Sequence, residues 1–139
     1  MLRSVKAEDY MTTNLITFKP DTDVYEAVQC LLKNRISGAP VVNVSGDLVG
    51  MFSEGDCLRS TLNATYYEGQ GGGVVSDFMS KEIDTVESDD SIIDIAEYFI
   101  KKNRRRLPVV DEGRLVGQIS RSDILRAMND FVVNSEYQQ

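Results

Sequence analysis

The sequence has no histidine, two cysteines and no apolar run that approaches the roughly 20 residues of a membrane span. Catalytic triads and dyads that use histidine as the base are therefore excluded. Two cysteines are too few for an ordinary zinc site, so we expect no metal, and we expect Cys30 and Cys57 to be small core residues. The N-terminal residues lack the apolar core of a signal peptide, which predicts a cytoplasmic protein.

Positive charge is also in short supply. The 15 lysines and arginines are outnumbered by 22 aspartates and glutamates, and the net charge is -7. An acidic chain is a poor partner for nucleic acid or for an anionic membrane. The basic run at 104–106 is the one feature that would favour nucleic acid, and the acidic balance weakens that hypothesis. The apolar fraction of 42% is typical of a globular protein.

What the chain does contain is an internal repeat. Residues 11–42 match residues 79–110 at a constant offset, and the match continues beyond a turn that is one residue shorter in the second copy. A deletion confined to a turn is what a structural repeat tolerates. The predicted organisation is a single module over 1–139, with repeat 1 at about 5–62, a linker at 63–74, repeat 2 at about 75–130 and a tail at 131–139.

Each copy shows the same succession of hydrophobic patterns. In the first copy a short apolar run at 15–18 predicts a strand, and apolar residues at helical spacing from Val24 predict an amphipathic helix. Two strands joined by a turn then begin at Pro40, and a second helix begins after Ser53. The second copy repeats these patterns at 83–86, Ile92, Pro108 and Ser120.

These patterns predict an α/β (α+β) fold built from two β-α-β-β-α repeats. A unit of about 50 residues buries too little apolar surface to be stable alone. We therefore expect the two repeats to pack sheet to sheet, with pseudo-two-fold symmetry and a shared core.

The repeated pattern Gly-x-x-Ser-x-x-Asp marks the turn from the last strand to the second helix of each copy. Its polar residues are Ser53 and Asp56 in the first copy and Ser120 and Asp123 in the second. Free N–H groups at a helix N-terminus and a serine hydroxyl suit a phosphate, and an aspartate on the first turn can accept hydrogen bonds from the two hydroxyls of a ribose. The alternative is ordinary helix capping without a ligand.

The chain resembles a tandem pair of cystathionine β-synthase (CBS) domains, also called a Bateman module. The residues that carry the resemblance are the two Pro-Val-Val strands, the segments 50–56 and 117–123, and the Met-x(5)-Thr start of each copy. The resemblance covers about residues 5–130. It implies a binding module for an adenosine compound, namely AMP, ADP, ATP or S-adenosylmethionine, held in clefts between the repeats.

The resemblance also implies which residues form the two clefts. The better cleft would use Ser120, Ser122 and Asp123 with Ile16, Thr17, Ile36 and Ser37. The second would use Ser53 and Asp56 with Asp84, Thr85, Arg104 and Arg105. The second cleft departs from the family because two arginines stand where an apolar and a small residue are usual. An arginine there could meet a phosphate, fill the base pocket, or belong to a solvated helix end.

The function expected from these observations is a non-catalytic regulatory sensor that requires no cofactor. It would form a homodimer and could signal to a separate effector protein. The main alternative is a structural dimerisation module with empty clefts. An enzyme that uses Asp56 or Asp123 as general base is a weaker alternative, because no nucleophile, histidine or metal cluster accompanies either carboxylate.

Overall fold

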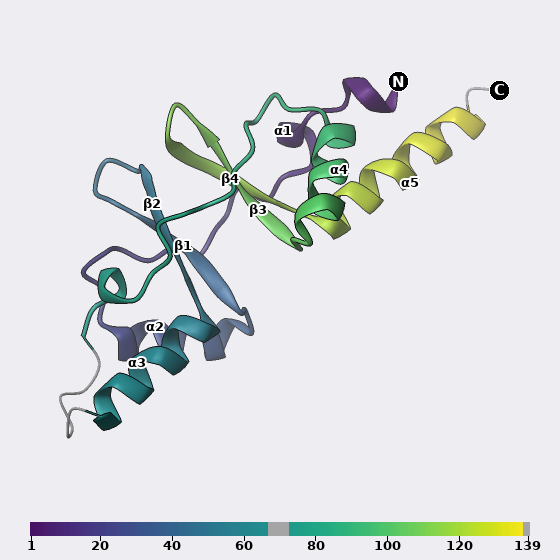
Figure 1. Ribbon diagram of the computed structural model, residues 1–139. Coiled ribbons are helices and arrows are strands. Elements are labelled where there is room, and N and C mark those ends of the chain that lie inside the picture. Colours follow the sequence, from purple (N-terminus) through teal and green to yellow (C-terminus); the bar gives the residue numbers. More distant parts are fainter. Residues whose placement is uncertain (67–72, 138–139) are drawn as a thin grey trace. The chain divides into compact units, whose positions relative to one another are not determined.

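The computed structural model describes residues 1–66 and 73–137, which fall into two compact units (Figure 1). Unit 1 combines Met1–Leu15 with Asp84–Gln139, and unit 2 is Ile16–Ile83. Each unit therefore holds the helices and hairpin of one repeat together with the segment that leads into the other repeat.

Unit 2 is built from two helices and a two-stranded antiparallel sheet. Its elements are α2 (Val24–Asn34), β1 (Gly38–Val42), β2 (Leu48–Ser53), α3 (Glu54–Tyr66) and the short 3-10 helix η2 (Val75–Asp77). Helix α2 begins after Asp23, whose carboxylate accepts a hydrogen bond from the Glu26 N–H at 3.2 Å. It ends at Arg35, which adopts the left-handed conformation with φ 54°.

Unit 1 repeats this arrangement. Its elements are η1 (Leu2–Ser4), α1 (Ala7–Tyr10), α4 (Ile92–Lys102), β3 (Arg106–Asp111), β4 (Arg114–Ser120) and α5 (Arg121–Tyr137). Strands β3 and β4 pair antiparallel, as β1 and β2 do, and both pairs shift register within the Val-Val dipeptide of the repeated motif. The mixed helix and strand architecture predicted from the sequence is confirmed.

Each unit buries its own apolar cluster. In unit 2 the cluster joins the inner face of α2 to the hairpin, and Phe18 and Phe52 meet edge to face with ring centroids 5.9 Å apart. In unit 1 the cluster joins α1, α4, the hairpin and α5. Val41 and Val109, which belong to the two Pro-Val-Val strands, are fully buried in their respective clusters.

The first predicted strand of each repeat is reduced to a single bridge. Phe18 pairs with Val41 and Val86 pairs with Val109, both in parallel orientation. Pairing extends no further because the chain turns immediately afterwards. The turn at Lys19 is closed by the Thr22 hydroxyl, and the turn at Glu87 is closed by the Asp90 carboxylate.

Two helices run further than the sequence suggests. Helix α3 continues to Tyr66 and α5 to Tyr137, into the segments assigned above to the linker and the tail. Neither segment offers an early helix breaker, since the first glycine of the linker is Gly69 and the tail has neither glycine nor proline. Most of the glycine run at 71–73 lies outside the described residues. None of the described helices is long and apolar enough to cross a membrane.

Candidate functional site

In unit 1 the repeated corner forms a reciprocal hydrogen-bonded box at the start of α5. The Ser120 N–H donates to the Asp123 carboxylate at 2.8 Å, and the Asp123 N–H donates to the Ser120 hydroxyl at 3.2 Å. This is the capping-box geometry expected when serine and an acidic residue stand three apart. Asp123 is 6% exposed, so its carboxylate is buried although it stands at a helix start.

The second oxygen of the Asp123 carboxylate is held by Arg126, whose guanidinium donates to it at 2.5 Å. The same guanidinium donates to the main-chain carbonyl of Tyr10 at 3.2 Å and lies 5.6 Å from the centroid of the Tyr10 ring. Hydrogen bonding to Asp123 raises the pKa of Arg126. The Tyr10 hydroxyl donates to Asp130 at 2.6 Å, and this bond raises the pKa of Tyr10.

Unit 2 presents the same corner without the tyrosine. Both the N–H and the hydroxyl of Ser53 donate to the Asp56 carboxylate, at 2.8 and 3.1 Å, and Arg59 pairs with its other oxygen. Asp56 is 2% exposed. The i, i+3 spacing of each arginine from its aspartate is the signal in the sequence for these ion pairs.

The first amide of each second helix is already occupied. The Glu54 N–H donates to the Ser37 carbonyl at 2.8 Å, and the Arg121 N–H donates to the Arg105 carbonyl at 3.0 Å. In each unit, this hydrogen bond connects the start of the second helix to the residue that precedes the first strand of the hairpin. The next amides, of Gly55 and Ser122, belong to the four that a helix leaves without an intrahelical partner, and they are the ones a phosphate would meet.

Asp84 and Arg104, two residues of the predicted second cleft, bind each other within unit 1. Their charged atoms are 2.8 Å apart, and hydrogen bonds from Tyr98 and Arg104 lower the pKa of Asp84. This pairing favours a structural role for Arg104 over an unpaired solvated end. Thr85 and Arg105 are exposed.

The remaining predicted residues are divided between the units. Ile16 and Ile36 pack against the unit 2 core, and Thr17 and Ser37 are exposed. Ser122 is exposed at the start of α5 in unit 1. Both predicted clefts combine residues of unit 1 with residues of unit 2, and that pairing stays a prediction.

The two cysteines are free and half-buried against the unit 2 core, in agreement with their predicted packing role. Burial, and then the neighbouring Asp56 carboxylate, raise the pKa of the Cys57 thiol. A raised pKa leaves less thiolate at neutral pH, so Cys57 is a poor nucleophile.

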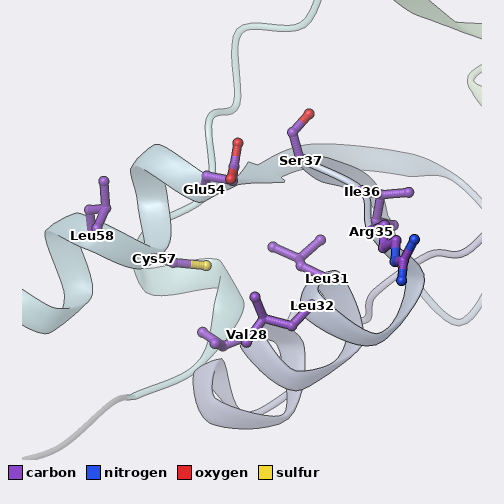
Figure 2. A pocket seen from close by; sticks show the side chains of 9 residues that line it. All are labelled: Val28, Leu31, Leu32, Arg35, Ile36, Ser37, Glu54, Cys57 and Leu58. Carbon is purple, nitrogen blue, oxygen red and sulfur yellow. The ribbon is translucent and has the colours of Figure 1, made fainter.

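Unit 2 also contains a cavity that the sequence did not predict. It has a volume of about 430 Å³ and lies between α2, the two residues that precede β1 and the start of α3 (Figure 2). Apolar side chains of α2 form much of its wall, and Figure 2 shows Cys57 pointing toward Leu31 and Leu32, with Glu54 and Ser37 along the rim.

Comparison with known proteins agrees with the repeat. A family model described as the CBS domain matches residues 7–63 and again residues 75–130. MJ1225, an uncharacterized protein of Methanocaldococcus jannaschii, is 31% identical over 127 residues, which are 91% of this chain and 44% of that protein. The chain thus spans less than half the length of this relative.

Two solved structures share the fold and contain adenosine compounds. CBSX2 of Arabidopsis thaliana in complex with AMP has a TM-score of 0.78 at 31% identity, over 91% of this chain and 97% of that chain. The CBS domain pair of protein MJ0100, in complex with 5'-methylthioadenosine and S-adenosyl-L-methionine, has a TM-score of 0.70 at 25% identity, over 91% and 97%. Because the family model accounts for most of the sequence, the chain belongs to the CBS domain family and carries two copies of the domain in tandem.

Proposed function

We propose that the protein is a regulatory module that binds an adenosine-containing ligand through its serine–aspartate corners and has no catalytic activity of its own. The observation that carries the proposal is the duplicated corner, in which a buried carboxylate stands at a helix start with serine hydroxyls beside it. AMP, ADP, ATP and S-adenosylmethionine are the candidate ligands, and relatives solved with AMP or with S-adenosylmethionine support this class.

The corner of unit 1 has the chemistry for a nucleotide. The Ser122 hydroxyl and amide, at the positive end of the α5 dipole, suit a phosphate. Each carboxylate oxygen of Asp123 has a second lone pair beyond those used by Ser120 and Arg126, so the two oxygens can accept from a pair of ribose hydroxyls. Arg126, whose side chain is more exposed than that of Asp123, can move aside to admit them.

Calorimetric titration with AMP, ATP and S-adenosylmethionine tests this function. Replacing Asp123 by Asn keeps the size of the side chain but removes the charged acceptor, and should weaken ligand binding by about tenfold or more. Asp56→Asn probes the second corner, and Glu26→Gln, an exposed change on α2, is the matched control. If the wild type binds no adenosine compound, the structural module takes the place of this proposal. If Asp123→Asn binds as tightly as the wild type, the assignment of Asp123 is wrong.

We further propose that the module forms a homodimer through the outer faces of its helices. On α5, Leu125, Met128 and Val132 are exposed at i, i+3 and i+7, which places three apolar side chains on one face. Helix α3 exposes Leu62. We also propose that the module signals to a separate effector protein and is cytoplasmic. These two parts of the proposal rest on the sequence alone.

A further inference from the structure

The two repeats differ at the junction where the first helix ends and the second begins. In unit 1 the side chain of Arg121 fills this junction. Its Nε donates to the Arg104 carbonyl at 2.6 Å, and an Nη donates to the Phe99 carbonyl at 3.0 Å. The guanidinium thus caps the C-terminal end of α4, where the helix dipole favours a cation.

In unit 2 the residue at the start of the second helix is acidic. Glu54 takes the position of Arg121, and its carboxylate has no hydrogen to donate to the carbonyls at the end of α2. The junction is the cavity of about 430 Å³ described above, and Glu54 stands on its rim (Figure 2). The space that an arginine occupies in one repeat is therefore open in the other.

Two of the polar groups around this space are acceptors, while the Ser37 hydroxyl and the Arg35 guanidinium can donate. Within the described part of the chain, nothing donates a hydrogen bond to the carbonyl of Ile36, the counterpart of Arg104, and nothing pairs with the Glu54 carboxylate. The end of α2 adds the negative pole of its dipole. Val28, Leu31 and Leu32 supply an apolar wall suited to the aliphatic stem of a long cationic side chain.

We propose that the cavity binds the side chain of an arginine from a partner polypeptide, in place of the arginine that unit 1 supplies for itself. A partner polypeptide is required rather than free arginine because the rim is apolar as well. Leu32 and Leu58 are 75% and 67% exposed. Covering them takes an apolar residue next to the arginine.

One charge in the cavity opposes this occupant. Arg35 lies at the end of α2 on the cavity wall, and Figure 2 shows it at a different place on the rim from Glu54. No ion pair joins these two residues. Their charges therefore act on an incoming guanidinium in opposite senses, and changing them one at a time separates the two effects.

The test is a titration of the full chain, labelled with nitrogen-15, followed by amide NMR. The probe is N-acetyl-leucyl-arginyl-leucine amide, and the comparison peptide has citrulline in place of arginine, with the same shape but no charge. We expect shifts at the amides of Ile36, Cys57 and Leu58 with the arginine peptide, and binding about tenfold weaker or worse with the citrulline peptide.

Three variants and one control variant sharpen the test. Glu54→Gln should weaken binding of the arginine peptide by about tenfold, and Arg35→Gln should strengthen its binding. Glu54→Arg should abolish binding by restoring the internal cap of unit 1, with an unchanged or higher melting temperature that shows the fold is intact. Glu26→Gln, exposed at the other end of α2, should bind like the wild type.

Several outcomes would overturn the proposal. These are no binding to the wild type at millimolar peptide, equal affinity for the citrulline peptide, or undiminished binding to Glu54→Arg. Equal affinity for arginine N-methylamide would make the cavity a small-molecule site. If the amide shift of Leu58 depends on the protein concentration rather than on the peptide concentration, the cavity would be assigned to contact with a second copy of the chain. Nucleotide titrations are separate, so failure here leaves the adenosine proposal standing.

Discussion

Arg126 links the Asp123 carboxylate to the main chain of Tyr10, with bonds of 2.5 and 3.2 Å from one guanidinium. Tyr10 ends α1, so a single side chain joins the corner of α5 to the N-terminal segment of unit 1. Asp123 is also the carboxylate proposed to bind ribose. A ligand that moves Arg126 would therefore release one of the contacts that hold α1.

The first prediction concerns this link. Arg126→Met should lower the free energy of unfolding, because it removes charge-assisted hydrogen bonds and leaves Asp123 without its cation. Urea denaturation followed by circular dichroism measures the loss. Arg59→Met is the matched control, since Arg59 pairs with Asp56 but has no tyrosine to hold. An equal or larger loss in Arg59→Met would contradict the role given to Tyr10.

The second prediction concerns Gly117, the glycine of the repeated corner in unit 1. A Cβ on Gly117 would lie 2.6 Å from the Met11 sulfur and 3.0 Å from the Thr12 carbonyl. Gly117→Ala should therefore destabilise the protein by about 1–3 kcal/mol.

Gly55→Ala is the control for that substitution. Gly55 lies in α3, where an added Cβ meets only ordinary contacts at 3.7 Å. In a helix this change should stabilise by roughly 0.5–1 kcal/mol. Thermal melts of the two variants should move in opposite directions, and a common direction would refute the packing argument.

Much of the fold was predictable because local sequence patterns specify most of its helices and strands. The apolar spacing from Val24 and the hairpin after Pro40 each specify an element without reference to the rest of the chain. The single bridge at Phe18 was not predictable in length, because the turn that ends it depends on the Thr22 hydroxyl closing back on Lys19.

The position of the candidate site in the sequence was predictable, but the burial and the contacts of its residues were not. The sequence located Asp123 at a helix start, yet its burial and the contact of Arg126 with Tyr10 depend on how α5 packs in unit 1. The cavity beside Glu54 was hidden for a different reason. It exists because one repeat lacks a side chain that the other has, and no pattern within one repeat reports that absence.

The third prediction concerns pH. The Ser88 hydroxyl and then its N–H donate to the Asp111 carboxylate, at 2.6 and 3.1 Å, and lower the pKa of that group. A carboxyl whose pKa is lowered by folding stabilises the native state above its ordinary value of 3.8, and this contribution is lost as the pH falls through the lowered value.

Ser88→Ala should raise the pKa of Asp111 toward its ordinary range, which a carbon-13 NMR titration of the carboxyl would measure. The stability difference between wild type and variant should be complete at neutral pH and shrink on acidification. Asp84, held by Tyr98 and Arg104, serves as the internal control and should titrate alike in both proteins. An unchanged Asp111 titration would show that Ser88 does not set its pKa.

The last prediction addresses self-association. If the apolar face of α5 joins two copies, the double variant Leu125→Lys and Met128→Lys should be monomeric, because it places two desolvated cations at the contact. Both side chains are exposed in the single chain, so the substitutions should leave its melting curve nearly unchanged. Val44→Lys is the matched control, since Val44 is 96% exposed and lies outside the helices. Light scattering across micromolar concentrations should give a dimer for the wild type and for Val44→Lys. A wild type that stays monomeric throughout, or a double variant that still dimerises, would rule out this face as the interface.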